Sequence, residues 1–171
     1  MYMNEIAFQK IQQLFNVVGA EYVVYTHPEC RTSEESARVR KEAGMPEAIG
    51  AKALLCKVDF KQGSEFVVFV LPGSHVIDKV KLKSVLTDLK QFRFSTKEEL
   101  LDIAGVVPGC MPPFGNQIFE NVQKLYISSA LKDFPRVAFN AAKLDASITL
   151  TTEDYLKAIV PDQIFDLSVS K

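Results

Sequence analysis

Apolar residues recur every three or four positions near the start of the chain. The positions are Ala7, Ile11, Leu14, Phe15 and Val18. This spacing predicts a helix over residues 4–18, and Gly19 is placed to end it. The same reasoning predicts four more helices, over residues 32–44, 76–89, 95–105 and 151–160. Three of these open with capping spacing, from Thr32 to Glu35, from Ser95 to Glu98 and from Thr151 to Asp154.

The remaining apolar runs have the short length of strands and are bounded by turn residues. Residues 51–60 and 64–73 are joined by the polar turn Lys-Gln-Gly, which predicts an antiparallel hairpin. Shorter strands are predicted over residues 22–25, 122–128, 136–140, 147–150 and 163–168. Runs of strands outnumber βαβ alternation, so the chain is predicted to be an α+β protein rather than a doubly wound one.

The length and composition fit one soluble domain. The 171 residues are 47% hydrophobic, which is enough to bury a core, so residues 1–171 are read as a single domain. The three cysteines are widely spaced and include no Cys-x-x-Cys pair, and the first residues lack the pattern of a signal peptide. No apolar run approaches the roughly 20 residues of a membrane span. We therefore expect a cytoplasmic protein with no membrane partner.

The net charge of −1 argues against the broad basic surface of a protein that coats nucleic acid, and no DNA partner is expected. Any contact with nucleic acid would be local. Residues 78–93 are the candidate, because Lys79, Lys81 and Lys83 gather there. A solvated amphipathic helix gives the same pattern, so both readings stay open.

The most unusual stretch is "GVVPGCMPPFG", residues 105–115, which holds three glycines and three prolines. Proline restricts φ, and glycine opens conformations closed to other residues, so this composition predicts a loop of defined shape. Such a loop presents backbone groups to a ligand at little entropic cost, but it serves equally well as a connector between two elements.

Few residues are suited to chemistry. The chain has two histidines, His27 and His75, and it has no Gly-x-Ser-x-Gly elbow, Walker loop, GxGxxG or metal-ligand spacing. Cys110 would be a nucleophile if His27 lay beside it, or else an inert buried thiol. Lys52 opens an apolar strand, where a lysine has either a functional role or a stem that reaches solvent.

Six motifs in order resemble the YbaK/prolyl-tRNA-synthetase-associated domain family. They are "YTHPECRTSEESA", "GAKALLCKV", "VLPG", "KLK", "GVVPGCMPPFG" and "FNAAKLDASITLTTEDYL", and the resemblance spans about residues 22–167. It implies a mixed, largely antiparallel, twisted and barrel-like sheet surrounded by helices. It also implies hydrolysis of the ester of a mischarged aminoacyl-tRNA, commonly alanine or cysteine on the proline tRNA, without a metal or organic cofactor.

The resemblance also implies roles for individual residues. Lys52 matches the essential lysine of the family. The implied substrate pocket is lined by His27, Gly109, Cys110, Met111, Pro112, Pro113, Phe114, Gly115, Asn140 and Ser147. The implied partner is the acceptor end of a mischarged tRNA, with Lys79, Lys81 and Lys83 as candidate tRNA contacts, and recruitment of prolyl-tRNA synthetase stays open.

Two other functions compete with hydrolysis by a positioned water. A binding module could retain the pocket for an aminoacyl-adenosine-like ligand or a tRNA end without catalysis. A cysteine hydrolase would act through Cys110. The sequence also departs from the family pattern at Cys110, Met111 and the Ala141-Ala142 pair, which leaves the pocket size and the amino acid removed undetermined.

Overall fold

The computed structural model describes residues 2–171. Its helices are α1 (Met3–Val18), α2 (Ser33–Glu42), α3 (Lys79–Val85), α4 (Lys97–Ala104), α5 (Thr152–Ala158) and a 3₁₀ turn, η1 (Ser129–Asp133). The first helix is confirmed, and Gly19 ends it in the left-handed conformation at φ 70°. The caps predicted at Thr32 and Thr151 are also confirmed, because each side chain accepts a hydrogen bond from the backbone three residues on.

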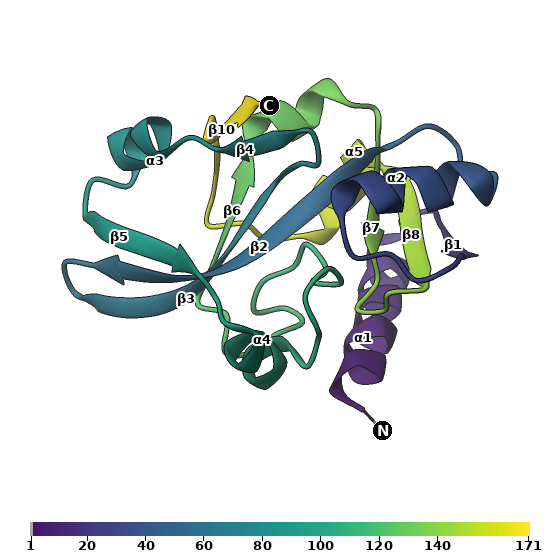
Figure 1. Cartoon of the computed structure of the whole chain (residues 1–171), viewed down its shortest axis with the longest axis horizontal. Coiled ribbons are helices and arrows are strands. Elements are labelled where there is room, and N and C mark those ends of the chain that lie inside the picture. Colours follow the sequence, from purple (N-terminus) through teal and green to yellow (C-terminus); the bar gives the residue numbers. More distant parts are fainter. Residues whose placement is uncertain (1) are drawn as a thin grey trace.

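The strands include the predicted hairpin. They are β1 (Tyr22–Thr26), β2 (Ile49–Phe60), β3 (Gly63–Pro72), β4 (His75–Ile77), β5 (Leu89–Phe94), β6 (Lys124–Ser128), β7 (Arg136–Asn140), β8 (Ala146–Thr151), β9 (Gln163–Phe165) and β10 (Ser168–Ser170). The larger sheet has the order β1-β8-β7-β2-β3-β6-β9, with β5 also paired to β2, and β4 pairs β10 separately. This mixed sheet with helices around it confirms the α+β class (Figure 1).

Three sequence predictions were wrong in detail. Residues 163–168 were predicted as one strand, but they form β9 up to Phe165 and enter β10 only at Ser168. Residues 76–89 were predicted as one helix, but they begin in β4, form the short α3 and end in β5. Pairing with distant strands, of β4 with β10 and of β5 with β2, overrides the local helical pattern. The cap of α4 is Thr96 with Glu99 rather than Ser95 with Glu98, because the Ser95 amide already donates to the Leu55 carbonyl.

Strand β2 organises the sheet, because its two sides have different partners. On one side it pairs with β3 from Ala51 to Phe60. On the other side it pairs first with β7, at Ile49 and Gly50, and later with β5, from Cys56 onward. The described chain gives residues 51–54 no strand partner on that side. Figure 1 shows β2 crossing the molecule between these two regions.

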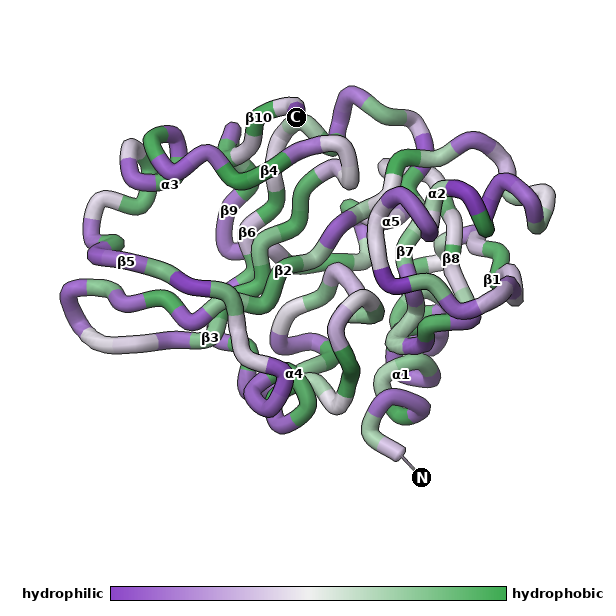
Figure 2. The backbone as a smooth tube through the Cα atoms, viewed as in Figure 1, coloured by the Kyte–Doolittle hydropathy of each residue, from purple (hydrophilic) through white to green (hydrophobic). Residues whose placement is uncertain are grey.

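Strand β3 carries a hydrophobic core on each face. Its residues Val68 and Val70 belong to the larger core, with Phe15, Phe114 and other side chains. Its intervening residues Val67, Phe69 and Leu71 belong to the second core, with Leu82 and Tyr126. Because successive side chains of a strand point to opposite faces of the sheet, β3 contributes to both cores. In contrast, α2 is strongly hydrophilic along most of its length (Figure 2), and its fully buried residues are Ser36 and Val39, with Arg40 partly buried.

None of the helices within residues 2–171 has the length and apolar character needed to cross a lipid bilayer.

Candidate active site

A cavity of about 1150 Å³ opens where β7 and β5 part from β2. Its floor is the stretch of β2 from Ile49 to Leu55, and the walls include α2 and residues Pro108, Gly109 and Met111 of the glycine-proline loop. The apolar part of the wall includes Leu55, Phe94, Leu100, Met111 and Phe139. The polar part includes Ser36, Arg40, Lys52 and Asn140, together with the charged residues Arg31, Glu34, Lys41, Glu47 and Lys171. A cavity that combines apolar walls with convergent polar groups has the form of a small-ligand site.

Lys52 lines this cavity and is half-buried. In the sheet it lies opposite Leu71 of β3, which places its side chain on the face of the second core. The ammonium donates a hydrogen bond to the carbonyl of His75. Burial, and then the positive charge of Lys171, lower the pKa of the Lys52 ammonium, while Glu34 acts in the opposite direction.

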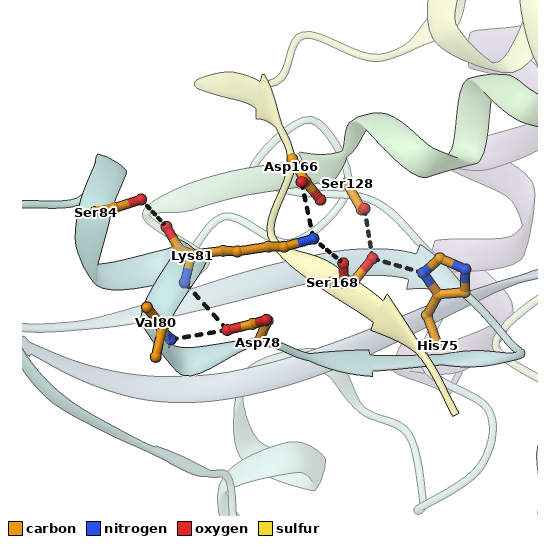
Figure 3. Close-up of polar contacts among 8 residues, drawn as sticks. All are labelled: His75, Asp78, Val80, Lys81, Ser84, Ser128, Asp166 and Ser168. Carbon is orange, nitrogen blue, oxygen red and sulfur yellow. Dashed lines mark hydrogen bonds and ion pairs between the residues drawn. The ribbon is translucent and has the colours of Figure 1, made fainter.

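The carbonyl that holds Lys52 is itself anchored. The His75 ring lies 2.9 Å from the Ser168 hydroxyl, which lies 2.7 Å from the Ser128 hydroxyl (Figure 3). The Lys81 ammonium lies 2.9 Å from the Asp166 carboxylate and donates to the Ser168 carbonyl at 3.2 Å, and Figure 3 marks both contacts. These contacts fasten β4 to β10, so His75 presents its carbonyl to Lys52 from a fixed position.

A second polar cluster joins three residues that sequence motifs singled out. Asn140 and Ser147 are cross-strand partners on β7 and β8, and the Ser147 hydroxyl lies 3.1 Å from the Asn140 amide oxygen. His27 Nε2 lies 2.7 Å from that hydroxyl, and Nδ1 lies 2.8 Å from the Pro28 carbonyl oxygen. A carbonyl only accepts hydrogen bonds, so Nδ1 carries a proton. The Asn140 amide nitrogen donates to the carbonyl of Gly109 at 3.0 Å, which ties the cluster to the loop.

Arg40 also belongs to this cluster, although no sequence motif marks it as a site residue. Its Nε donates to the Ser147 hydroxyl at 2.9 Å, and its Nη2 donates to the Asn140 amide oxygen at 3.0 Å. Burial lowers the pKa of its guanidinium to about 10. In sequence Arg40 stands within the charged run of α2 and resembles a solvated residue. Its hydrogen bonds to Asn140 of β7 and Ser147 of β8 distinguish it from the exposed Arg38, which pairs with Glu42.

The glycine-proline loop divides into two parts. Gly109 and Met111 line the cavity. Gly109 has φ +96°, and a Cβ there would lie 2.6 Å from the Arg31 carbonyl oxygen, so this position requires glycine.

The rest of the loop belongs to the core, although the resemblance implied that it lines the pocket. The residues that are buried outside the cavity wall are Cys110, Pro112, Pro113, Phe114 and Gly115. Phe114 packs edge-on against Phe139 and Tyr155, and the Tyr155 hydroxyl donates to the Pro113 carbonyl at 2.7 Å. The loop is therefore an anchored support as well as a wall.

The lysines of α3 lie outside the cavity. Lys79 and Lys83 are exposed, and the Lys79 ammonium lies 6.0 Å from the centre of the Phe92 ring. Lys81 is half-buried and engaged with Asp166. The helix therefore presents two exposed cations, Lys79 and Lys83, whereas Lys81 is bound to Asp166 and to β10.

Comparison with known proteins identifies the family. The model of the aminoacyl-tRNA editing domain matches residues 27–158, which is most of the chain. The chain belongs to this family. An Escherichia coli K12 protein named multifunctional Ser/Thr-tRNA deacylase ProXp-y is 30% identical over 165 residues, covering 96% of this chain and 95% of that protein.

Two further comparisons place the editing domain among its relatives. A proline-tRNA ligase of Staphylococcus epidermidis is 28% identical over 114 residues, which are 67% of this chain and 18% of the ligase. A solved structure described as a proposed trans-editing enzyme for prolyl tRNA synthetase shares the fold, with a TM-score of 0.71 and 19% identity over 96% of this chain and 98% of that one. Sequences similar to this chain therefore make up nearly the whole of one relative and a short part of a longer ligase.

The surroundings of Cys110 predict an unreactive thiol. Its Sγ donates to the Val107 carbonyl at 3.3 Å, burial raises its pKa, and His27 is engaged elsewhere. At neutral pH we expect iodoacetamide to label Cys110 of the folded editing domain more than about tenfold more slowly than in the urea-unfolded chain. Peptide mass spectrometry over time measures this. Equal rates in the two states would contradict the inert assignment and revive the cysteine hydrolase.

Proposed function

We propose that this editing domain is a trans-acting aminoacyl-tRNA deacylase that hydrolyses the ester of mischarged tRNA. The observation that carries the proposal is the Lys52 ammonium in a cavity walled by Gly109 and Met111, within a chain of this family. The near full-length similarity to a protein named as a Ser/Thr-tRNA deacylase supports it further.

The proposed chemistry is direct hydrolysis. A water oxygen attacks the ester carbonyl carbon, the bond from that carbon to the ribose oxygen breaks, and the ribose oxygen takes up a proton. The products are the free amino acid and uncharged tRNA. Lys52 turns its ammonium from the His75 carbonyl to the ester carbonyl oxygen, where it stabilises the negative charge that develops. An aminoacyl ester is already activated, so positioning and charge stabilisation suffice.

The substrate amino acids are proposed to be small. Alanine and cysteine on the proline tRNA are the expectation from the resemblance, and the relative's name adds serine and threonine. The Met111 side chain and the Leu55, Leu100 and Phe139 side chains bound the apolar part of the cavity. One methylene changes binding there by only about 1–3 kcal/mol, so several small amino acids are expected to be accepted.

A panel of aminoacyl-tRNAs tests the function directly. We expect the folded protein to release alanine, cysteine, serine or threonine from mischarged tRNA well above the buffer rate and to spare correctly charged Pro-tRNA. Acid-gel separation of charged and uncharged tRNA measures this. Binding of the charged tRNA end without turnover would instead support the non-catalytic binding module, and neither binding nor turnover would reject both functions.

Substitution of Lys52 separates catalysis from architecture. We expect Lys52→Ala to lower single-turnover deacylation by about 10²-fold or more, the scale of losing one oxyanion-stabilising group. Lys52→Arg is also expected to be poor, because a planar guanidinium does not replace a compact ammonium. The thermal midpoint should not fall through loss of the charge, since a lysine whose pKa folding lowers holds its charge at a cost in stability. Full activity in Lys52→Ala would end the assignment.

Contact with the tRNA body is proposed for the exposed lysines of α3. We expect Lys79→Glu combined with Lys83→Glu to weaken tRNA binding and to reduce its salt dependence, because two phosphate contacts would be lost. Filter binding at several salt concentrations measures both effects. Lys81 is left in place, because its removal would break the ion pair with Asp166 and disturb β10. An unchanged affinity and salt slope would exclude this surface.

A further inference from the structure

Arg40 is a cation whose hydrogen bonds within residues 2–171 are made to neutral groups. Within residues 2–171, the ion pairs leave Arg40 without a carboxylate partner inside 4 Å. Two of its three nitrogens are held by neutral groups, the Ser147 hydroxyl and the Asn140 amide oxygen. A largely desolvated charge is costly unless an opposite charge approaches it. The missing partner is therefore expected to be supplied from outside the chain.

The third nitrogen, Nη1, faces the cavity. It is 3.5 Å from the position that a Cβ of Gly50 would occupy, and both Gly50 and Arg40 line the cavity wall. Among the hydrogen bonds of the described chain, Arg40 donates only from Nε and Nη2, and Nη1 is not among the buried unsatisfied atoms. Because Gly50 has no side chain, a ligand has access to Nη1 from the cavity.

The chemistry of the proposed substrate selects one anion. The carboxyl group of an aminoacyl-tRNA is esterified and therefore uncharged, so the anionic groups near the ester are the phosphates of the acceptor end. An arginine that is held by two of its nitrogens and offers the third is suited to a phosphate oxygen. We propose that Arg40 Nη1, at the gap left by Gly50, binds the phosphate on the 5′ side of the terminal adenosine. This inference rests on the proposed function.

The assignment gives Lys52 and Arg40 different roles in the cavity. Lys52 donates to the His75 carbonyl from a flexible stem and is free to move to the ester. Arg40 is fixed to β7 and β8 by Asn140 and Ser147 and acts as a stationary anchor. His27 holds the Ser147 hydroxyl from the other side and so acts as a positioning residue. A structural role for Arg40, as a clamp of α2 on the sheet, is the competing account.

Adenosine 5′-monophosphate and adenosine are the probes, because they differ only by this phosphate and require no turnover. Isothermal titration calorimetry is expected to show that the wild type binds the monophosphate about tenfold more tightly than adenosine, the scale of one charge-assisted hydrogen bond. In Arg40→Gln this preference is expected to disappear. The control is Arg38→Gln, on the same helix but exposed and paired with Glu42, which should keep the preference.

Gly50→Ala is the second variant, because Arg40→Gln also removes two internal hydrogen bonds. The added methyl group would meet Nη1 at an ordinary contact distance of 3.5 Å and would screen it while leaving the cluster intact. It is expected to abolish the preference for the monophosphate without lowering the thermal midpoint.

The inference is overturned if the wild type shows no preference for the monophosphate at millimolar concentration, whether it binds both probes or neither. It is also overturned if either Arg40→Gln or Gly50→Ala keeps the preference, or if Arg38→Gln loses it. These results are separable from the proposed function. If the protein prefers the monophosphate through Arg40 but hydrolyses no aminoacyl-tRNA, only the proposed deacylase function is refuted. If it deacylates aminoacyl-tRNA without preferring the monophosphate, only the phosphate contact is refuted.

Discussion

The pairing of β2 is the constraint on which the site depends. Ten residues of β2, from Ala51 to Phe60, pair with β3, so the strand is held along its length from one side. Its other side is shared between β7 and β5, which pair only with its two ends. Between β7 and β5, residues 51–54 of β2 are held by β3 on one side and have no described strand partner on the other. A cavity floor of this kind exposes backbone and side chains without losing order, because β3 supplies the hydrogen bonds that fix it.

This arrangement brings Lys52 and Arg40 into one cavity from different supports. Lys52 projects from β2 toward the carbonyl of His75, which the β4–β10 pair holds in place. Arg40 comes from α2, whose inner side meets the end of β7 and β8. Burial lowers the pKa of both groups. Because burial disfavours the charged form of both groups, an anionic ligand or a developing negative charge in the cavity would stabilise them.

The glycine-proline loop both lines the cavity and packs in the core, and its composition alone did not show which residues do which. Gly109 reaches a backbone conformation that leaves no room for a side chain beside Arg31, and its carbonyl accepts the Asn140 amide. Phe114 and the Pro113 carbonyl are fixed by the aromatic core around Tyr155. The part of the loop that packs in the core, around Phe114, holds in place the part that lines the cavity, around Gly109. The defined backbone shape therefore stabilises the fold and also presents backbone groups to the cavity.

The sequence by itself determined the local elements and the motif residues. The spacing of apolar residues, the cap at Thr32 and the Lys-Gln-Gly turn predicted α1, α2 and the β2–β3 hairpin, because these signals act within a few residues. Only the tertiary structure decided that residues 76–89 split between β4, α3 and β5, since their strand partners are distant in the chain. It also decided the role of Arg40, because the burial of a charge depends on what packs over it and not on its neighbours in sequence.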